Sequence, residues 1–101
     1  MKAVRIHEHG DAGIVQYESV PEPKPKIDEV LVQVKAAAMN HLDLWVRRGI
    51  PGTPLPMILG SDGSGVITQI GNDVTQFQVG DNVCIQPLIY CGHCRFCSRG
   101  Q

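Results

Sequence analysis

The sequence lacks the features of three classes of protein. No apolar run approaches the roughly 18 residues that a membrane-spanning helix needs. Lys and Arg do not cluster in any stretch, and the net charge is −1, so there is no electrostatic footprint for nucleic acid. The N-terminal segment, Met1–His9, has no apolar core of a secretory signal peptide. We therefore expect a cytoplasmic protein without a membrane or nucleic-acid partner.

The composition indicates one small domain in a reducing compartment. The chain has 101 residues, of which 43% are apolar, enough for a modest core. Four cysteines in such a compartment favour metal binding over disulfides. Two disulfides in a secreted domain are the alternative, and the N-terminal segment disfavours it.

Short strands dominate the predicted elements. Val30, Val32 and Val34 fall on one face of the segment 28–38 and Gln33 falls on the other, a period of two that indicates a half-buried strand. Closely spaced strands and frequent glycine predict a mainly β domain, either a barrel or sandwich-like. The other expected strands cover residues 2–6, 14–20, 63–70 and 82–85.

One short helix is predicted over His41–Arg48. Asn40 is a good N-cap and Gly49 a good C-terminal stop. Arg47 lies in the last turn with Arg48, where the helix dipole favours cations.

The most specific motif is Cys91-Gly92-His93-Cys94-Arg95-Phe96-Cys97, with the spacing C-x2-C-x2-C. Thiolates two residues apart on a tight turn can converge on one metal ion, and zinc is the default for such a site. Gly92 permits the backbone bend that this turn requires. Zinc prefers four ligands, and Gln101 is reached before a fourth appears, so we expect the polypeptide to be incomplete.

Two further interpretations of the cysteines stay open. An iron–sulfur cluster is less favoured, because the bacterial ferredoxin pattern requires a cysteine where Gln101 stands. Cys84 lies in a predicted strand, where we expect a small core residue rather than a ligand. His93 is expected to be exposed.

The glycines Gly60, Gly63 and Gly65 do not form a dinucleotide-binding fingerprint. That fingerprint reads G-x-G-x-x-G, follows a strand and opens a helix. Here the order is reversed and a strand follows. We therefore expect no nucleotide-binding fold within this chain, and glycines that allow a tight bend and close strand packing.

Four segments together resemble the N-terminal half of the medium-chain dehydrogenase/reductase family, which includes zinc-type alcohol dehydrogenases and quinone oxidoreductases. They are Asn40–Leu44, Leu59–Val66, Val79–Val83 and Cys91–Cys97. The resemblance covers the whole chain and implies a GroES-like β-barrel over residues 1–101, with the Rossmann domain of the family outside this chain. It also implies a structural zinc held by Cys91, Cys94, Cys97 and a fourth cysteine four residues past Gln101.

The sequence departs from this family at its catalytic metal. Members with a catalytic zinc carry Cys where this chain has Asn40, and Gly-His-Glu where it has Gly60-Ser61-Asp62. An amide and a hydroxyl are poor replacements for thiolate and imidazole. The chain thus resembles the branch without catalytic zinc, such as quinone and enone reductases. Asn40 and Asp62 become the candidate catalytic residues.

Two neighbours of Asn40 have roles that the resemblance implies. His41 matches a position that contacts the cofactor pyrophosphate, and an exposed helix residue is the alternative. Asp43 matches a position that braces the zinc-binding His, whose place Ser61 now takes, so we expect it to cap or pair locally.

The resemblance implies the N-terminal part of an oxidoreductase that uses NADP or NAD. The full-length protein would transfer hydride to or from a small-molecule carbonyl, alcohol or conjugated enone, as a homo-oligomer. The 101 residues alone are expected to be inactive and prone to associate through open sheet edges. A small non-enzymatic zinc module, used for structure or partner binding, is the alternative from a different class.

Overall fold

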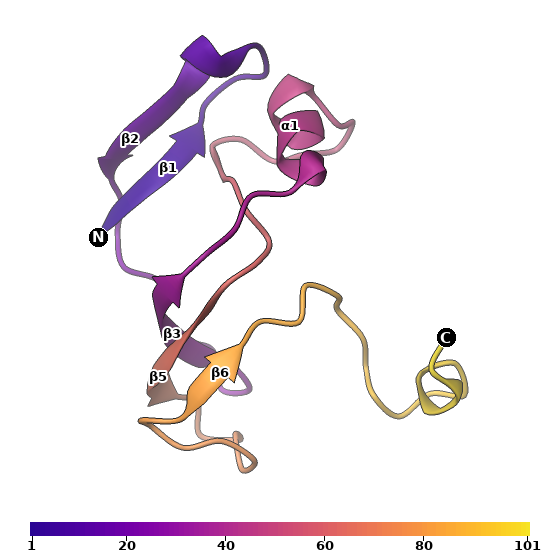
Figure 1. Cartoon of the computed structure of the whole chain (residues 1–101). Helices are drawn as coiled ribbons and strands as arrows, with labels where there is room; N and C mark the ends of the chain where they lie inside the picture. Colours follow the sequence, from indigo (N-terminus) through magenta and orange to yellow (C-terminus); the bar gives the residue numbers. More distant parts are fainter.

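Six strands and one α-helix make up the regular structure, and the computed structural model describes all of residues 1–101 (Figure 1). The strands are β1 (Lys2–Ile6), β2 (Val15–Ser19), β3 (Val30–Ala36), β4 (Met57–Ile58), β5 (Ser64–Ile70) and β6 (Asn82–Cys84). The helix is α1 (His41–Arg48), and the short 3-10 turns are η1 (Ala12–Ile14) and η2 (Cys97–Arg99). The prediction of a mainly β fold with one short helix is confirmed.

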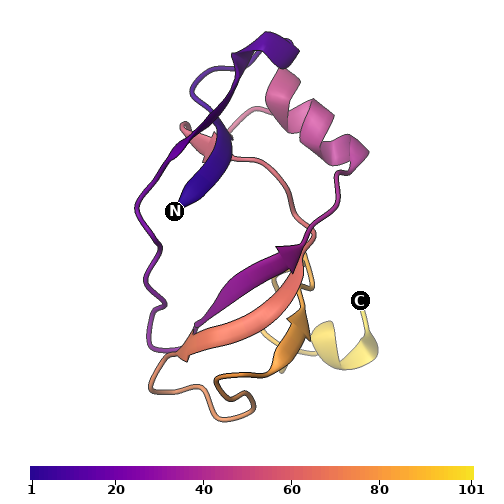
Figure 2. The same cartoon turned by 60° about the vertical axis from the view of Figure 1, so that its left-hand side comes forward.

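The strands form two antiparallel sheets of three strands each. One has the order β2-β1-β4 and the other β3-β5-β6. Figures 1 and 2 show the first sheet beside α1 and the second below it. In Figure 1 the last residues extend away from both sheets. No strand pair joins the two sheets, so these six strands do not by themselves close the predicted barrel.

The buried core is small and divided between the sheets. Ile6 of β1 and Ile67 of β5 are the two large side chains that are fully buried, and Ala3 and Val20 are also buried. Most other large apolar side chains keep substantial exposure. The hydrophobic contribution to stability from these residues is therefore limited, since it scales with the apolar area removed from water.

The alternation predicted for β3 is only partly realised as burial. Val30 and Val32 are half-buried, whereas Val34 is 54% exposed. The pairing of β3 with β5 shifts register twice, between Leu31 and Val32 and between Val34 and Ala36. Such bulges bend a strand and interrupt its side-chain alternation, so its C-terminal half faces a hollow instead of a packed core.

The strands predicted over 14–20, 63–70 and 82–85 are each one or two residues shorter in the structure, and one strand was not predicted. The second strand begins at Val15 instead of Ile14, because Ala12–Ile14 form η1 behind Asp11, whose carboxylate accepts a 3.0 Å hydrogen bond from the Gly13 amide. The strand β4, which has two residues and pairs with the end of β1, was not predicted. Two residues are too few to show the alternation of apolar and polar side chains that identifies a strand.

The helix α1 forms within the predicted bounds and is tied to the β1–β2 hairpin. The Gly49 amide ends it with a 2.9 Å hydrogen bond to the Trp45 carbonyl. The Gly10 amide donates to the Arg47 carbonyl at 3.0 Å, and His9 Nδ1 lies 3.0 Å from the Val46 carbonyl oxygen. The hairpin therefore fixes the C-terminal end of α1.

No helix in the structure has the length and apolar character to cross a bilayer.

A charged cluster lies across β1 and β2. The Glu18 carboxylate accepts a hydrogen bond from the Arg5 guanidinium and lies 2.5 Å from His7 Nε2. These hydrogen bonds, that of Arg5 first, hold the pKa of Glu18 below its usual value. A lowered carboxyl pKa stabilises the fold at neutral pH, and this contribution is lost as the pH falls through that pKa.

Gly65 is where β3 and β5 approach most closely. A Cβ atom at this position would lie 2.0 Å from the Gln33 carbonyl oxygen and 2.8 Å from its carbon. Because the obstacle is backbone, no side-chain rotation relieves it. The expectation that glycine serves close strand packing here is confirmed.

Gly65→Ala should separate β3 from β5 and lower the free energy of unfolding by about 2 kcal/mol or more, at the upper end of overpacking effects. Urea denaturation followed by circular dichroism measures it. Gln69→Ala, at an exposed position on the same strand, is the control and should stay within about 0.5 kcal/mol of wild type. Equal stability of the two variants would contradict the close approach.

Candidate functional site

Cys91, Cys94 and Cys97 form a cluster at the C-terminal end of the chain. Their three Sγ atoms all lie within 4.8 Å of one another, and those of Cys91 and Cys97 are 3.8 Å apart. Cys94 and Cys97 are half-buried and Cys91 is exposed. The structure therefore brings together the three residues that the sequence motif singled out.

Local backbone geometry produces this convergence. Gly92 has φ +83°, a left-handed conformation that glycine adopts without steric cost. The Cys97 amide donates to Cys94 Sγ at 3.4 Å, and the Ser98 amide donates to the Cys94 carbonyl at 3.0 Å. The segment is thus folded by its own short-range hydrogen bonds, and we call residues 86–101 the cysteine lobe.

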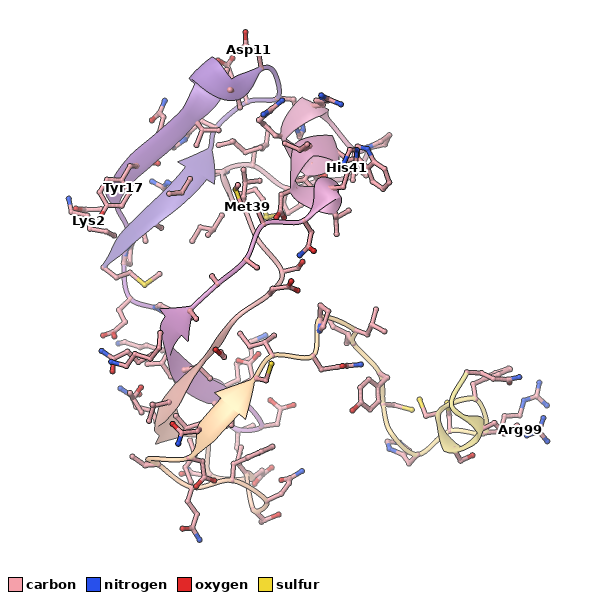
Figure 3. The ribbon with its side chains drawn as sticks, viewed as in Figure 1. Lys2, Asp11, Tyr17, Met39, His41 and Arg99 are labelled. Atoms are coloured by element: carbon pink, nitrogen blue, oxygen red, sulfur yellow. The ribbon has the colours of Figure 1, made fainter.

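The cysteine lobe shares no hydrogen bond with the two sheets. All hydrogen bonds of residues 86–101 stay within the lobe, and the last bond before it runs from the Ile85 amide to the Gly63 carbonyl at 2.8 Å. Figure 3 shows Arg99 at the far tip of the lobe, away from both sheets.

The thiol of Cys91 is activated by its neighbours. Hydrogen bonds from the backbone amides of His93 and Cys94, followed by one from the Cys94 side chain, lower the pKa of Cys91 to about 7. The thiolate is the form that ligates metals, and three sulfur donors on a tight turn suit a thiophilic ion such as zinc. The donor set therefore fits a metal ion.

His93 and Cys84 do not belong to the cluster of three sulfur atoms. His93 is exposed, as expected. Cys84, expected in the core, is also exposed, because it lies at the end of β6 on the outer edge of its sheet.

Asn40 and Asp62 meet at a second place, outside the cysteine cluster. Asn40 Nδ2 donates to Asp62 Oδ2 at 2.8 Å, although 22 positions separate the two residues. The antiparallel pairing of β3 with β5 explains this proximity. Ala36 at the end of β3 lies opposite Ser64 at the start of β5, so the segments leading to Asn40 and from Asp62 leave the same end of the sheet.

The backbone of Asn40 is fixed by the start of α1. Asn40 is the extended N-cap residue, and its amide donates to the Asp43 carboxylate at 2.9 Å. The Asp43 amide in turn donates to the Asn40 carbonyl at 3.0 Å. Asp43 thus caps the helix locally, as the sequence analysis expected.

Two hollows meet at Asp62. The larger has a volume of about 690 Å³ and lies between the two sheets and α1. Its walls are mainly apolar, with Val4, Val34 and Leu44 among them, and Ser61 also lines it. The smaller, about 420 Å³, lies on the β6 side of Asp62. A mainly apolar cavity with a few polar groups at its edge is the usual form of a small-molecule site.

His41 does not join the Asn40–Asp62 pair. It is exposed in the first turn of α1, and its ring meets that of Trp45 edge-on with centroids 5.0 Å apart. Figure 3 shows His41 on the outer side of the helix and Met39 in the segment leading into it. His41 is therefore available to an external group near the start of the helix. Its contact with Trp45 was not predicted, although the i, i+4 spacing of the two residues on a helix was a signal for it.

Comparison with known proteins identifies the relatives of this chain. Residues 26–101 match the family model described as the alcohol dehydrogenase GroES-like domain. An alcohol dehydrogenase of Geobacillus stearothermophilus is 45% identical over 91 residues, covering 86% of this chain and 27% of that protein.

Solved structures agree with these sequence matches. A thermostable alcohol dehydrogenase from Pyrobaculum aerophilum, with cobalt and zinc bound, matches 99% of this chain and 30% of its own, with a TM-score of 0.91 and 37% identity. The Escherichia coli quinone oxidoreductase complexed with NADPH matches 83% of this chain and 26% of its own, with a TM-score of 0.79 and 28% identity. The chain therefore spans less than a third of the length of these relatives.

Cys94→Ser should weaken metal binding by more than about 10-fold, since even changes around the ligands have that effect. Titration with cobalt(II), followed by its thiolate absorption, measures the affinity. Cys84→Ser is the matched control and should bind cobalt(II) like wild type, because Cys84 lies outside the cluster. A similar loss in both variants would contradict the assignment.

In the metal-free protein, alkylation of Cys91 by iodoacetamide should become half-maximal near pH 7, against about 8.5 for an ordinary thiol. The thiolate is the nucleophile. The alkylation rate should therefore rise as the pH increases through this midpoint and should decrease as the pH drops below it. Peptide mass spectrometry across a pH series measures it. Cys91→Ser should remove the fast-reacting site, and survival of that site would refute the prediction.

Proposed function

Because this chain belongs to the family of alcohol dehydrogenase GroES-like domains, we propose that it is the N-terminal part of an NAD- or NADP-dependent oxidoreductase. The full-length enzyme would transfer hydride to or from a small-molecule carbonyl, alcohol or conjugated enone. In the carbonyl direction, carbonyl, reduced nicotinamide and a proton give the alcohol and oxidised nicotinamide. The family match over residues 26–101 is the observation that carries the proposal.

In this proposal residues 1–101 form the GroES-like domain, and the Rossmann domain lies in a part of the protein outside this chain. The nicotinamide, when bound, supplies or accepts the hydride. The exposed position of His41 at the start of α1 supports a role for it in contacting the cofactor phosphates. The apolar residues Leu88, Ile89 and Tyr90 are largely exposed, which favours burial in a homo-oligomer or against the rest of the protein.

Asn40 and Asp62 are the proposed polar groups of the active site. The Asn40 side-chain amide would donate to the substrate oxygen, which gains negative charge as hydride arrives, a role that preorganised donors fill in other enzymes. Asn40 and Asp62 are hydrogen-bonded to each other at 2.8 Å, and an amide with a single carboxylate is a weak zinc site. This supports a reaction without a catalytic metal.

The Cys91, Cys94 and Cys97 thiolates would hold one structural zinc, with a fourth ligand from outside these residues. Zinc in this position would cross-link the cysteine lobe, a structural role distinct from that of Asn40 and Asp62. The full-length protein should therefore contain one zinc per protomer, measurable by elemental analysis. Two zincs, or none, would refute this assignment.

An assay of the full-length protein tests the function. The protein is mixed with reduced nicotinamide and one of a panel of enones, quinones and aldehydes, and oxidation of the nicotinamide is followed by its absorbance. Asn40→Ala should lower kcat by about 100-fold, the effect of removing one oxyanion donor. Asn72→Ala, at an exposed turn position, is the control and should leave kcat unchanged. Zinc binding without any nicotinamide binding would instead favour a non-enzymatic zinc module.

A further inference from the structure

We propose that Asp62 is a positioning residue, which holds the Asn40 side-chain amide with its nitrogen, rather than its oxygen, turned towards Asp62, so that the second N–H of that nitrogen can donate to the substrate. The inference rests on the proposed function, in which Asn40 donates to the substrate oxygen. It adds the orientation of that donor and the group that sets it.

An asparagine amide has two ends of nearly equal size and opposite hydrogen-bonding character. Rotation by half a turn exchanges the NH₂ donor and the carbonyl acceptor. An ionised carboxylate only accepts hydrogen bonds, so it selects the rotamer in which Asn40 Nδ2 faces it. The observed 2.8 Å contact to Asp62 Oδ2 is this arrangement, and hydrogen bonds to an ionised acceptor are stronger than neutral ones.

The main chain is hydrogen-bonded at Asn40 and next to Asp62. At Asn40 the amide and the carbonyl are each engaged with Asp43, at 2.9 Å and 3.0 Å. Asp62 precedes Gly63, which is buried and whose carbonyl accepts the 2.8 Å hydrogen bond from the Ile85 amide. The contact therefore joins the N-cap of α1 to a residue beside a hydrogen-bonded position of the second sheet.

One N–H group of Asn40 Nδ2 is engaged by Asp62, and the structure gives the second no partner. Asp62 lines both hollows at this end of the sheet, whereas Asn40 lines neither and is exposed beside them, so the free N–H is open to a ligand oxygen that approaches from solvent. A hydrogen bond from one N–H to the carboxylate fixes the orientation of the amide and leaves its second N–H free to donate. The carboxylate also disfavours anionic substrates at this edge, since like charges repel, and thus favours a neutral carbonyl compound.

A double-mutant cycle in the full-length protein tests the inference. Asp62→Asn keeps the shape but replaces a carboxylate that only accepts with an amide that can present either a donor or an acceptor. The Asn40 amide then loses its single preferred orientation, and kcat should fall about 10-fold to 100-fold with little change in KM. In an Asn40→Ala background, Asp62→Asn should have no further effect, because Asp62 acts through Asn40. Asp73→Asn, at an exposed turn position without a side-chain hydrogen bond, is the control and should match wild type.

Independent, multiplying losses in kcat from Asp62→Asn and Asn40→Ala would overturn the inference, because a merely structural or separate role for Asp62 gives additive free energies. A second measurement follows the side-chain NH₂ signals of selectively ¹⁵N-labelled asparagine, with that of Asn40 assigned by its loss in Asn40→Ala. Asp62→Asn should shift the Asn40 signals and leave those of Asn72 and Asn82 in place. Unshifted Asn40 signals would also overturn it.

The two measurements separate this inference from the proposed function. A wild-type protein without any hydride transfer, whose Asn40 signals nevertheless shift in Asp62→Asn, would refute the proposed function and with it the catalytic use of the contact. An active wild type with unchanged Asn40 signals would refute the positioning role alone.

Discussion

The antiparallel pairing of β3 with β5 is the constraint on which the Asn40–Asp62 pair depends. β3 leads to the N-cap of α1 and β5 follows the segment that carries Asp62, so the pairing brings together two residues 22 positions apart. At Gly65 the two backbones lie so close that a Cβ atom would clash with Gln33. The hairpin then fixes the far end of α1 through Gly10 and His9. The polar pair is thus the product of a non-local fold, although each partner is an ordinary surface residue.

Local signals in the sequence predicted the local parts of this structure. Cap and stop residues gave the bounds of α1, because the first and last turns of a helix need specific partners. The spacing of three cysteines gave the cluster, because their convergence requires only a few turns of backbone. The burial of β3 was predicted less well, since bulges in its pairing with β5 decide where Val34 points, and no single-strand pattern contains its partner.

The Asn40–Asp62 hydrogen bond and the two-residue strand β4 could not be predicted from the sequence. Nothing in the spacing of the two polar residues relates them, and both derive their position from strand pairing. The resemblance to the family marked these positions as departures from a metal site, but the contact between the two side chains is visible only in three dimensions. The chain therefore combines a cluster of three cysteines with a separate hydrogen-bonded polar pair.

The cysteine lobe shares no hydrogen bond with the two sheets. A segment with only internal bonds can open and close as its own cooperative unit, at a free energy below that of global unfolding. It is therefore a modular appendage, and its gain, loss or elaboration during evolution need not disturb the geometry on which Asn40 and Asp62 rely.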